Sequence, residues 1–186
     1  METIVLSSPK GGQGVTTTAV ALATTIANGG TKTNIRSIDN SDDLTAVLGL
    51  ASSEWLDEYV ATDLHAGQTR PEGTEVDVVD AGTTQDSPAV RENYRSIATS
   101  LRHFLVIRPC YLALRAAMRQ GIDGYEGVIL LDEPGRALTM KDIEDILGIP
   151  IVAVVPVDPS IARAVDAGIL VRRIPEIIAK PLRKVR

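Results

Sequence analysis

The chain has 186 residues, which suits one domain of ordinary size with its own hydrophobic core. Apolar residues make up 44% and charged residues 23%, whereas aromatic residues make up only 3%, so the core must consist of Val, Ile, Leu and Ala. That composition is typical of a buried parallel sheet. A single cysteine, Cys110, excludes an internal disulfide. The sequence has neither a basic-then-apolar leader nor an apolar run of membrane-spanning length, so we expect a cytoplasmic protein.

The net charge of -5 is distributed unevenly along the chain. Residues 172–186 contain six basic residues and one acid, a net charge of +5, which leaves about -10 on the residues before them. A basic tail on an acidic body is a candidate contact surface for a polyanion. We therefore expect a single domain over 1–186 with a basic carboxyl-terminal tail over 172–186.

Strand signals and helix signals alternate along the chain. In chain order the first half predicts strand Thr3–Ser7, helix Thr16–Asn28, strand Asn34–Ile38, short helices Asp42–Leu50 and Glu54–Ala61, and a turn-rich connection over 65–74. The second half predicts strand 75–82, helix Ala89–Ser100, strand 103–109, helix Leu112–Gln120, strand 127–134, helix Met140–Leu147 and strand 149–158. This alternation predicts an α/β fold with a mostly parallel, twisted sheet, helices on both faces, and a ligand beyond the carboxyl ends of the strands.

A glycine-rich stretch, KGGQGVTT (residues 10–17), joins the first predicted strand to the first predicted helix. Gly11, Gly12 and Gly14 let the backbone turn its N–H groups inward without obstruction from a Cβ atom. The start of the following helix adds the positive end of its dipole, so the loop suits phosphate oxygens. Thr16 occupies the place where the hydroxyl of a phosphate-binding loop coordinates magnesium.

The loop departs from the general pattern G-x-x-x-x-G-K-[ST] at two positions. Pro9 takes the place of the first glycine, and Val15 takes the place of the lysine. A charge-assisted hydrogen bond contributes about 1.5 to 3 kcal/mol, so the missing ammonium should weaken nucleotide binding by roughly tenfold to hundredfold. Hydrolysis depends more strongly on charge stabilisation at the transferring phosphate, so we expect slow turnover.

The same loop resembles the deviant Walker A motif of the ParA/MinD family of P-loop ATPases, written KGGxGKTT, and departs from it only at Val15. The resemblance implies ATP and Mg²⁺ as cofactors and a homodimer that forms on ATP binding. In that dimer Lys10 would reach the phosphates of the partner subunit and act in catalysis. The nucleotide contacts that the resemblance implies in the loop are Gly11, Gly12, Gln13, Gly14, Val15, Thr16 and Thr17.

Three further segments resemble the same family. Residues 37–49 resemble the segment that positions the attacking water, which implies a catalytic role for Asp39. Residues 75–84 resemble the Walker B segment, which implies that Asp80 holds magnesium together with Thr16. Residues 138–168 resemble the stretch that ends the sheet and forms the adenine pocket, and the implied contacts there are Pro156, Val157 and Asp158.

Plainer explanations stay open for several of these features. Asp80 also fits a cap for the turn after its strand, and Asp39 precedes ordinary helix-capping residues. A glycine loop followed by Asp39 at the end of the second strand also partly matches an NAD-binding Rossmann fingerprint. The third glycine of G-x-G-x-x-G would then fall on Thr17, which counts against that alternative.

The tail carries an apolar stripe with basic residues on its other faces. Ile174, Ile178, Leu182 and Val185 recur at helical spacing, although Pro181 interrupts the pattern. The stripe either packs onto its own domain or leaves the tail free to bind DNA phosphates or anionic lipid. We favour non-specific DNA, since a helix broken by proline with few bulky apolar residues inserts poorly into a bilayer. The basic residues expected to contact DNA are Arg172, Arg173, Lys180, Arg183 and Lys184.

Taken together, these features predict a ParA/MinD-like ATP-binding protein that acts as a nucleotide-dependent dimerisation switch in DNA partition or intracellular positioning. We expect it to be a weak ATPase, to act on an unidentified partner protein, and to lie in the cytoplasm, at the nucleoid where its tail binds DNA. The alternative is a localisation scaffold of the CpaE/TadZ kind, which binds nucleotide without hydrolysing it and also lacks the second lysine.

Overall fold

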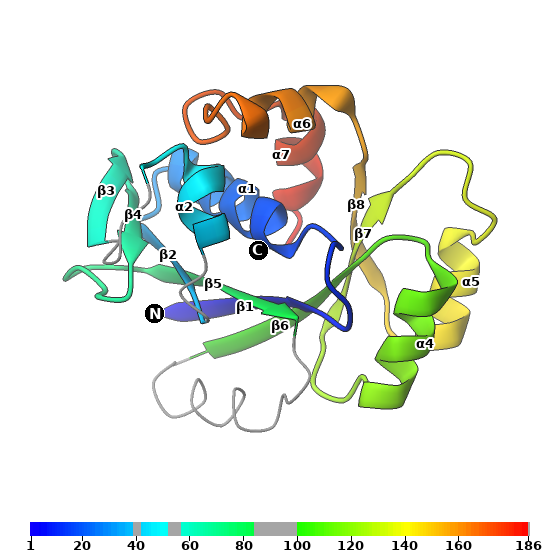
Figure 1. Ribbon diagram of the computed structural model, residues 1–186. Coiled ribbons are helices and arrows are strands. Elements are labelled where there is room, and N and C mark those ends of the chain that lie inside the picture. The colour runs from blue at the N-terminus through cyan, green and yellow to red at the C-terminus, as the bar shows by residue number, and fades with distance from the viewer. Residues whose placement is uncertain (39–41, 52–56, 84–99, 186) are drawn as a thin grey trace.

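The computed structural model describes residues 1–38, 42–51, 57–83 and 100–185 and arranges them around one eight-stranded sheet (Figure 1). The strands are β1 (Glu2–Ser8), β2 (Thr33–Ser37), β3 (Asp57–Ala61), β4 (Leu64–Gly67), β5 (Val76–Thr83), β6 (Ser100–Ile107), β7 (Gly127–Asp132) and β8 (Ile151–Pro156). The helices described are α1 (Val15–Asn28), α2 (Asp42–Leu48), α4 (Tyr111–Gln120), α5 (Met140–Leu147), α6 (Pro159–Asp166) and α7 (Glu176–Leu182). The expected helix over Ala89–Ser100 falls on residues outside those described, apart from Ser100, which begins β6.

The sheet has the order β3-β4-β2-β5-β1-β6-β7-β8, and only the β3–β4 pair is antiparallel. Helices α1, α2, α6 and α7 cover one face, whereas α4 and α5 cover the other face beside β6 and β7 (Figure 1). The prediction of a mostly parallel α/β sheet with helices on both faces is therefore confirmed.

The core beneath α1 is built from aliphatic side chains, as the composition predicts. Ile4 and Leu6 of β1 and Ile35 of β2 are fully buried on the face that α1 covers. Residues 19–23 of α1 are also fully buried, and three of these five are alanines, so the helix can pack closely on the sheet. This packing fixes the start of α1 relative to the carboxyl end of β1.

Two expected elements between β2 and β5 are wrong. Residues 57–61 form strand β3 rather than part of a helix over Glu54–Ala61, and β4 extends into the segment 65–74 that was expected to be a connection. The two strands form an antiparallel hairpin in which Tyr59 pairs with His65. The rings of these two residues pack edge to face, with their centroids 5.0 Å apart. Aromatic and β-branched residues such as Tyr59 and Val60 favour strands once a partner strand is present. Residues 54–56 lie outside those described.

The amphipathic stripe of the tail packs onto the domain. Ile178, Leu182 and Val185 are buried, and α7 packs against α1 and β8. Pro181 lies inside the short helix α7, whose last turn ends at Leu182. Among the described residues, no helix combines the length and the hydrophobicity that crossing a membrane requires.

The first strand is bordered by β5 and β6, so β5 separates β1 from β2. The carboxyl ends of these parallel strands meet at one edge of the sheet, where the loop after β1 leads into α1 (Figure 1). Asp80 near the end of β5 and the segment after β8 lie along the same edge. The topology thus brings three predicted site segments to one edge.

Candidate functional site

The loop between β1 and α1 takes a conformation that requires glycine. Gly12 and Gly14 have φ of 75° and 83°, in the left-handed region that glycine enters without a Cβ penalty. Gly14 is the N-cap of α1, and no side chain caps this helix start. The first-turn N–H groups of α1 are therefore left for a ligand, and the helix dipole favours an anionic one.

Hydrogen bonds to two neighbouring elements hold this loop in place. Gln13 is buried, and its Oε1 accepts a hydrogen bond of 2.9 Å from the backbone N–H of Arg108, just after β6. Gln120 at the end of α4 donates from its side-chain amide to the carbonyl of Pro9 over 3.2 Å. The loop is thus fixed before any ligand binds, which lowers the entropy cost of binding.

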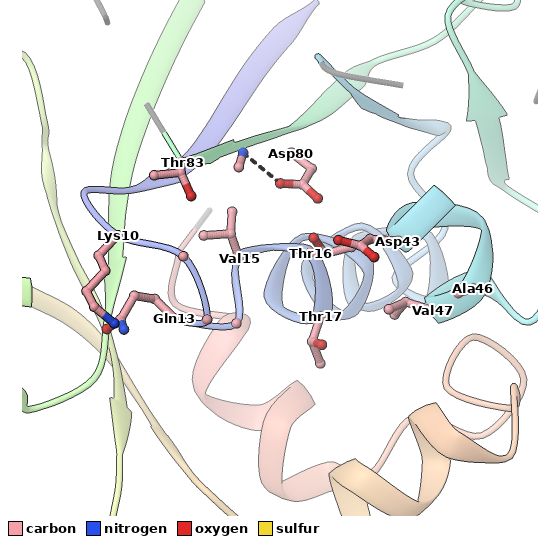
Figure 2. Close-up of a pocket in the computed structure, with 14 residues that line it drawn as sticks. Lys10, Gln13, Val15, Thr16, Thr17, Asp43, Ala46, Val47, Asp80 and Thr83 are labelled. Carbon is pink, nitrogen blue, oxygen red and sulfur yellow. Dashed lines mark hydrogen bonds between the residues drawn. The ribbon is translucent and has the colours of Figure 1, made fainter. Parts of the chain in front are cut away.

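A cavity of about 400 Å³ opens between this loop, the end of β5 and α2 (Figure 2). Its volume lies within the range of small-molecule sites. The loop and first helical turn contribute Lys10, Gly11, Gly12, Gln13, Gly14, Val15, Thr16 and Thr17; β5 contributes Asp80, Gly82 and Thr83; and α2 contributes Asp43, Ala46 and Val47. The structure therefore brings the predicted loop contacts together with Asp80.

The two predicted magnesium ligands line this cavity from different elements. Asp80 is buried on β5, and its Oδ1 accepts a hydrogen bond of 2.9 Å from the N–H of Gly82, as the interpretation of a strand-end cap also expects. Thr16 lies in the first turn of α1, and Asp43 of α2 lines the same cavity (Figure 2). Hydroxyl and carboxylate oxygens are the donors that Mg²⁺ prefers, so the residues present suit this ion.

A second cavity, of about 270 Å³, adjoins the first, and Gly14 and Thr17 line both. The remaining lining residues come from α1, the ends of β6, β7 and β8, α6 and α7: Thr18, Arg108, Leu131, Val155, Pro156, Val157, Asp158, Ile161, Ala162, Val165, Asp166 and Ile178. Most of these side chains are apolar, as expected of a site for a planar base. The predicted adenine contacts Pro156, Val157 and Asp158 all belong to this cavity.

One wall of the second cavity is the start of α6, where Asp158 is the N-cap. Hydrogen bonds from the side chain and the backbone N–H of Ser160, the latter of 2.7 Å, lower the pKa of Asp158. The carboxylate is therefore ionised at neutral pH and acts as a hydrogen-bond acceptor at the rim of the cavity.

The strand order contradicts the NAD-binding alternative. In the Rossmann order 3-2-1-4-5-6 the first two strands are neighbours, so the acid that ends the second strand lies next to the glycine loop. Here β5 lies between β1 and β2. The strand order of this chain is therefore not that of the Rossmann fold.

Comparison with solved structures shows which proteins share the fold of this chain. The chain aligns with the septum site-determining protein MinD of Pyrococcus horikoshii, complexed with Mg-ADP, at a TM-score of 0.77 and 19% identity over 100% of this chain and 94% of that one. A ParA family ATPase from Chlorobium tepidum aligns at 0.72 and 16% identity, over 96% of this chain and 95% of that one. A variant of McdA from Cyanothece, in complex with ATP, aligns at 0.71 and 15% identity, over 100% and 95%. The chain has the fold of the MinD and ParA ATPases.

No protein-family model and no curated protein matches the sequence. The MinD/ParA likeness is therefore a likeness of structure, at identities below 20%. It covers the whole of β1, the glycine loop and α1, and it extends through α7, since nearly the full length of each chain is aligned.

Val15, which takes the place of the second lysine in the KGGxGKTT pattern, is a buried hydrophobic side chain in this structure. Val15 is only 7% exposed and belongs to the core beneath α1. Lys10 is exposed, and its side chain extends away from Asp80 (Figure 2). Among the described residues that line the first cavity, Lys10 is the only basic one.

The sequence analysis did not predict two residues that line the cavities, and one predicted residue lies outside those that the structure describes. Asp39 lies outside the described residues. Asp43 was interpreted only as a helix-capping acid, although it lines the first cavity. Arg108 was overlooked, although it follows β6 directly and the rule that ligands bind at strand ends would have singled it out.

Cys110 lies close to the loop at the N-cap of α4. The backbone N–H of Ala113 is the main cause that lowers the pKa of the Cys110 thiol, and the positive charges of Arg136 and Lys10 add to it. The thiol therefore ionises more readily than an ordinary cysteine.

The predicted DNA contacts lie on the outer side of the tail. While the stripe of α7 is buried, the basic side chains face solvent: Arg172, Arg173, Lys180, Arg183 and Lys184 are all exposed. Arg183 also makes an ion pair of 2.7 Å with Glu176. Four of the five cations have no salt bridge among the described residues.

Proposed function

We propose that this chain is a ParA/MinD-like ATP-binding protein that uses Mg²⁺, dimerises on ATP binding and acts as a switch in DNA partition or intracellular positioning. The start of α1 supports this proposal most strongly. Its N-cap is Gly14, no side chain caps it, and Gly14 lines both cavities. One cavity has donors for a polyphosphate and oxygen ligands for a metal, and the other suits a base. Neighbours of the same fold bind Mg-ADP and ATP.

In the proposed complex the main-chain N–H groups of the loop hold the polyphosphate. The Thr16 hydroxyl and, through water, the Asp80 carboxylate would hold magnesium, and Asp39 would position the attacking water. When bound, the metal counters charge on the transferring phosphate. Because Val15 supplies no ammonium at that phosphate, turnover is slow.

The placement of Lys10 supports the proposed dimerisation. Its side chain is exposed and extends away from the Asp80 of its own subunit, so it is better placed to reach phosphates of a second copy (Figure 2). A docked partner would therefore complete the charge of the site. Release of the partner on hydrolysis would reverse the switch, and a chain that binds ATP without hydrolysing it would instead act as a stable scaffold.

Light scattering with Mg-ATP and Mg-ADP tests the switch. We expect the molar mass to double with Mg-ATP but not with Mg-ADP. The Lys10→Ala variant should remain monomeric with both nucleotides, while its affinity for ADP changes less than threefold. Lys141→Ala, which removes an exposed lysine on α5, is the matched control and should dimerise as the parent does. Single-turnover hydrolysis then separates the slow ATPase from the non-hydrolysing scaffold. A parent chain that binds neither nucleotide would overturn the proposed function.

The exposed cations of the tail support non-specific DNA binding as the output of the switch. We expect the double variant Lys180→Gln, Lys184→Gln to weaken DNA binding and to reduce the slope of log K against log salt by about 2, since each phosphate contact contributes about 0.9. Fluorescence anisotropy over a salt series measures this slope. The control is Lys32→Gln, Lys141→Gln, which removes equal charge from exposed sites elsewhere. DNA binding that is unchanged in half-molar salt would contradict an electrostatic contact with DNA. Binding to anionic vesicles in place of DNA would contradict DNA as the partner of the tail.

A further inference from the structure

Arg108 lines the second cavity of the site, and its backbone is hydrogen-bonded to the glycine loop. It follows β6 directly, and β6 is the neighbour of β1 in the sheet. Its side chain lines the second cavity together with Gly14 and Thr17, the two residues that also line the first cavity. Sequence motifs assign no role to Arg108, because it belongs to neither the glycine loop nor the Walker B segment.

The guanidinium of Arg108 is incompletely partnered in the described part of the chain. Its Nε is buried and makes no hydrogen bond there. Two acids, Asp158 and Asp166, line the same cavity, yet neither forms a salt bridge or hydrogen bond with Arg108 in the described structure. A buried donor of a charged group without a partner is costly, so such a group in a native cavity points to a ligand.

The backbone of Arg108 is tied to the glycine loop. Its N–H donates to the buried Oε1 of Gln13 over 2.9 Å. This bond holds the backbone of Arg108 beside the loop that would hold the polyphosphate. The origin of the Arg108 side chain is thus placed before binding, which lowers the entropy cost of a contact with a ligand of that loop.

We infer that the guanidinium of Arg108 binds the phosphate nearest the nucleoside and supplies, within one subunit, a positive charge that the loop lacks at Val15. This inference rests on the proposed function. A nucleotide that spans both cavities would pass Gly14 and Thr17, so its first phosphate would lie at their junction, within reach of the second cavity that Arg108 lines. Planar guanidinium groups bind phosphate oxygens in bidentate fashion.

The position of Arg108 sets which ligands it affects. The first phosphate is common to ATP, ADP and AMP and is absent from adenosine. Arg108 therefore contributes to all three nucleotides in the resting monomer, whereas Lys10 would contribute only when a second copy docks. Arg108 would thus hold the nucleotide in the monomer, and Lys10 would act in the dimer.

Calorimetric titration of Arg108→Met with ATP, ADP and adenosine, each with magnesium, tests the inference. We expect affinity for ATP and for ADP to fall by about tenfold to hundredfold, with adenosine affinity unchanged. Arg108→Lys, which keeps the charge without the planar fork, should lose less than Arg108→Met. The matched control is Arg119→Met, which removes an exposed arginine from α4 and should bind as the parent does.

The melting temperature without nucleotide is measured for each variant, so that a folding defect is separated from a binding defect. If Arg108→Met melts as the parent does and binds ADP equally well, the inference is wrong while the proposed function stands. An equal loss for adenosine and ADP also overturns it, since Arg108 would then contact the nucleoside. A parent chain that binds no nucleotide overturns the proposed function itself.

Discussion

Val15→Lys is expected to raise the affinity for Mg-ATP by about tenfold to hundredfold, because it restores a charge-assisted hydrogen bond to the polyphosphate. Val15 lies in the first turn of α1 and lines the first cavity, so a longer side chain can extend from it toward the ligand. Tighter binding by this factor adds about 1.4 to 2.8 kcal/mol of stabilisation at the same excess of nucleotide. Calorimetry measures the affinity, and single-turnover assays measure hydrolysis, which we expect to accelerate by at least as much.

Val15→Met is the control that separates charge from size. Val15 is 7% exposed and belongs to the core, so any longer side chain disturbs packing in a similar way. Without nucleotide, Val15→Lys should be less stable than Val15→Met, because an ammonium near an apolar core costs free energy. Equal nucleotide affinity in these two variants would show that position 15 does not set the charge of the site.

The glycine loop and its neighbours were predictable because their signals are local. The loop sequence fixes a left-handed turn at Gly12 and Gly14, and the helix that follows is a continuous run of helix-compatible residues. The capping box at the start of α5 is equally local, with Thr139 accepting from the N–H of Asp142 at 3.2 Å. Such features need no knowledge of the rest of the chain.

The hairpin of β3 and β4 could not be predicted in the same way. Its strands have five and four residues, too short for a helical period to be told from a strand period. What decides their conformation is the pairing of Tyr59 with His65 and of β4 with β2, which is tertiary information.

The role of the tail and the place of Arg108 also depend on tertiary structure. The stripe of the tail is visible in the sequence, yet only the fold shows that Leu182 and Val185 complete the core beneath α1. Arg108 has no motif around it, and its importance appears only when β6 is placed beside β1. The order of strands, with β5 between β1 and β2, likewise leaves no trace in the local pattern.

Gly14→Ala is expected to destabilise the chain by about 2 to 5 kcal/mol and to lower its nucleotide affinity by more than tenfold. The φ of 83° costs an L-residue about 1 to 2 kcal/mol. A Cβ at this position would lie 2.6 Å from Cδ1 of Leu131, and overpacking adds about 1 to 3 kcal/mol. Thermal unfolding should show a melting temperature lower by roughly 4 to 20 °C for a chain of this size.

The loss of affinity has a geometric cause. Leu131 lines the second cavity, and Gly14 lies between that cavity and the first. A methyl group on residue 14 therefore pushes Leu131 toward the space for the base and moves the first N–H groups of α1 away from the phosphates. Both changes act on the same ligand, so binding should suffer more than stability alone explains.

Gly12→Ala is the matched control for the contact with Leu131. Gly12 has a similar φ of 75°, but a Cβ there would meet nothing within 4 Å. It should therefore carry the backbone cost alone, about 1 to 2 kcal/mol, and melt several degrees above Gly14→Ala. Adding Leu131→Ala to Gly14→Ala should relieve the contact, so that the pair loses less than the two single changes combined. If Gly12→Ala and Gly14→Ala melt alike and the pair is additive, the close approach of Leu131 does not constrain the loop.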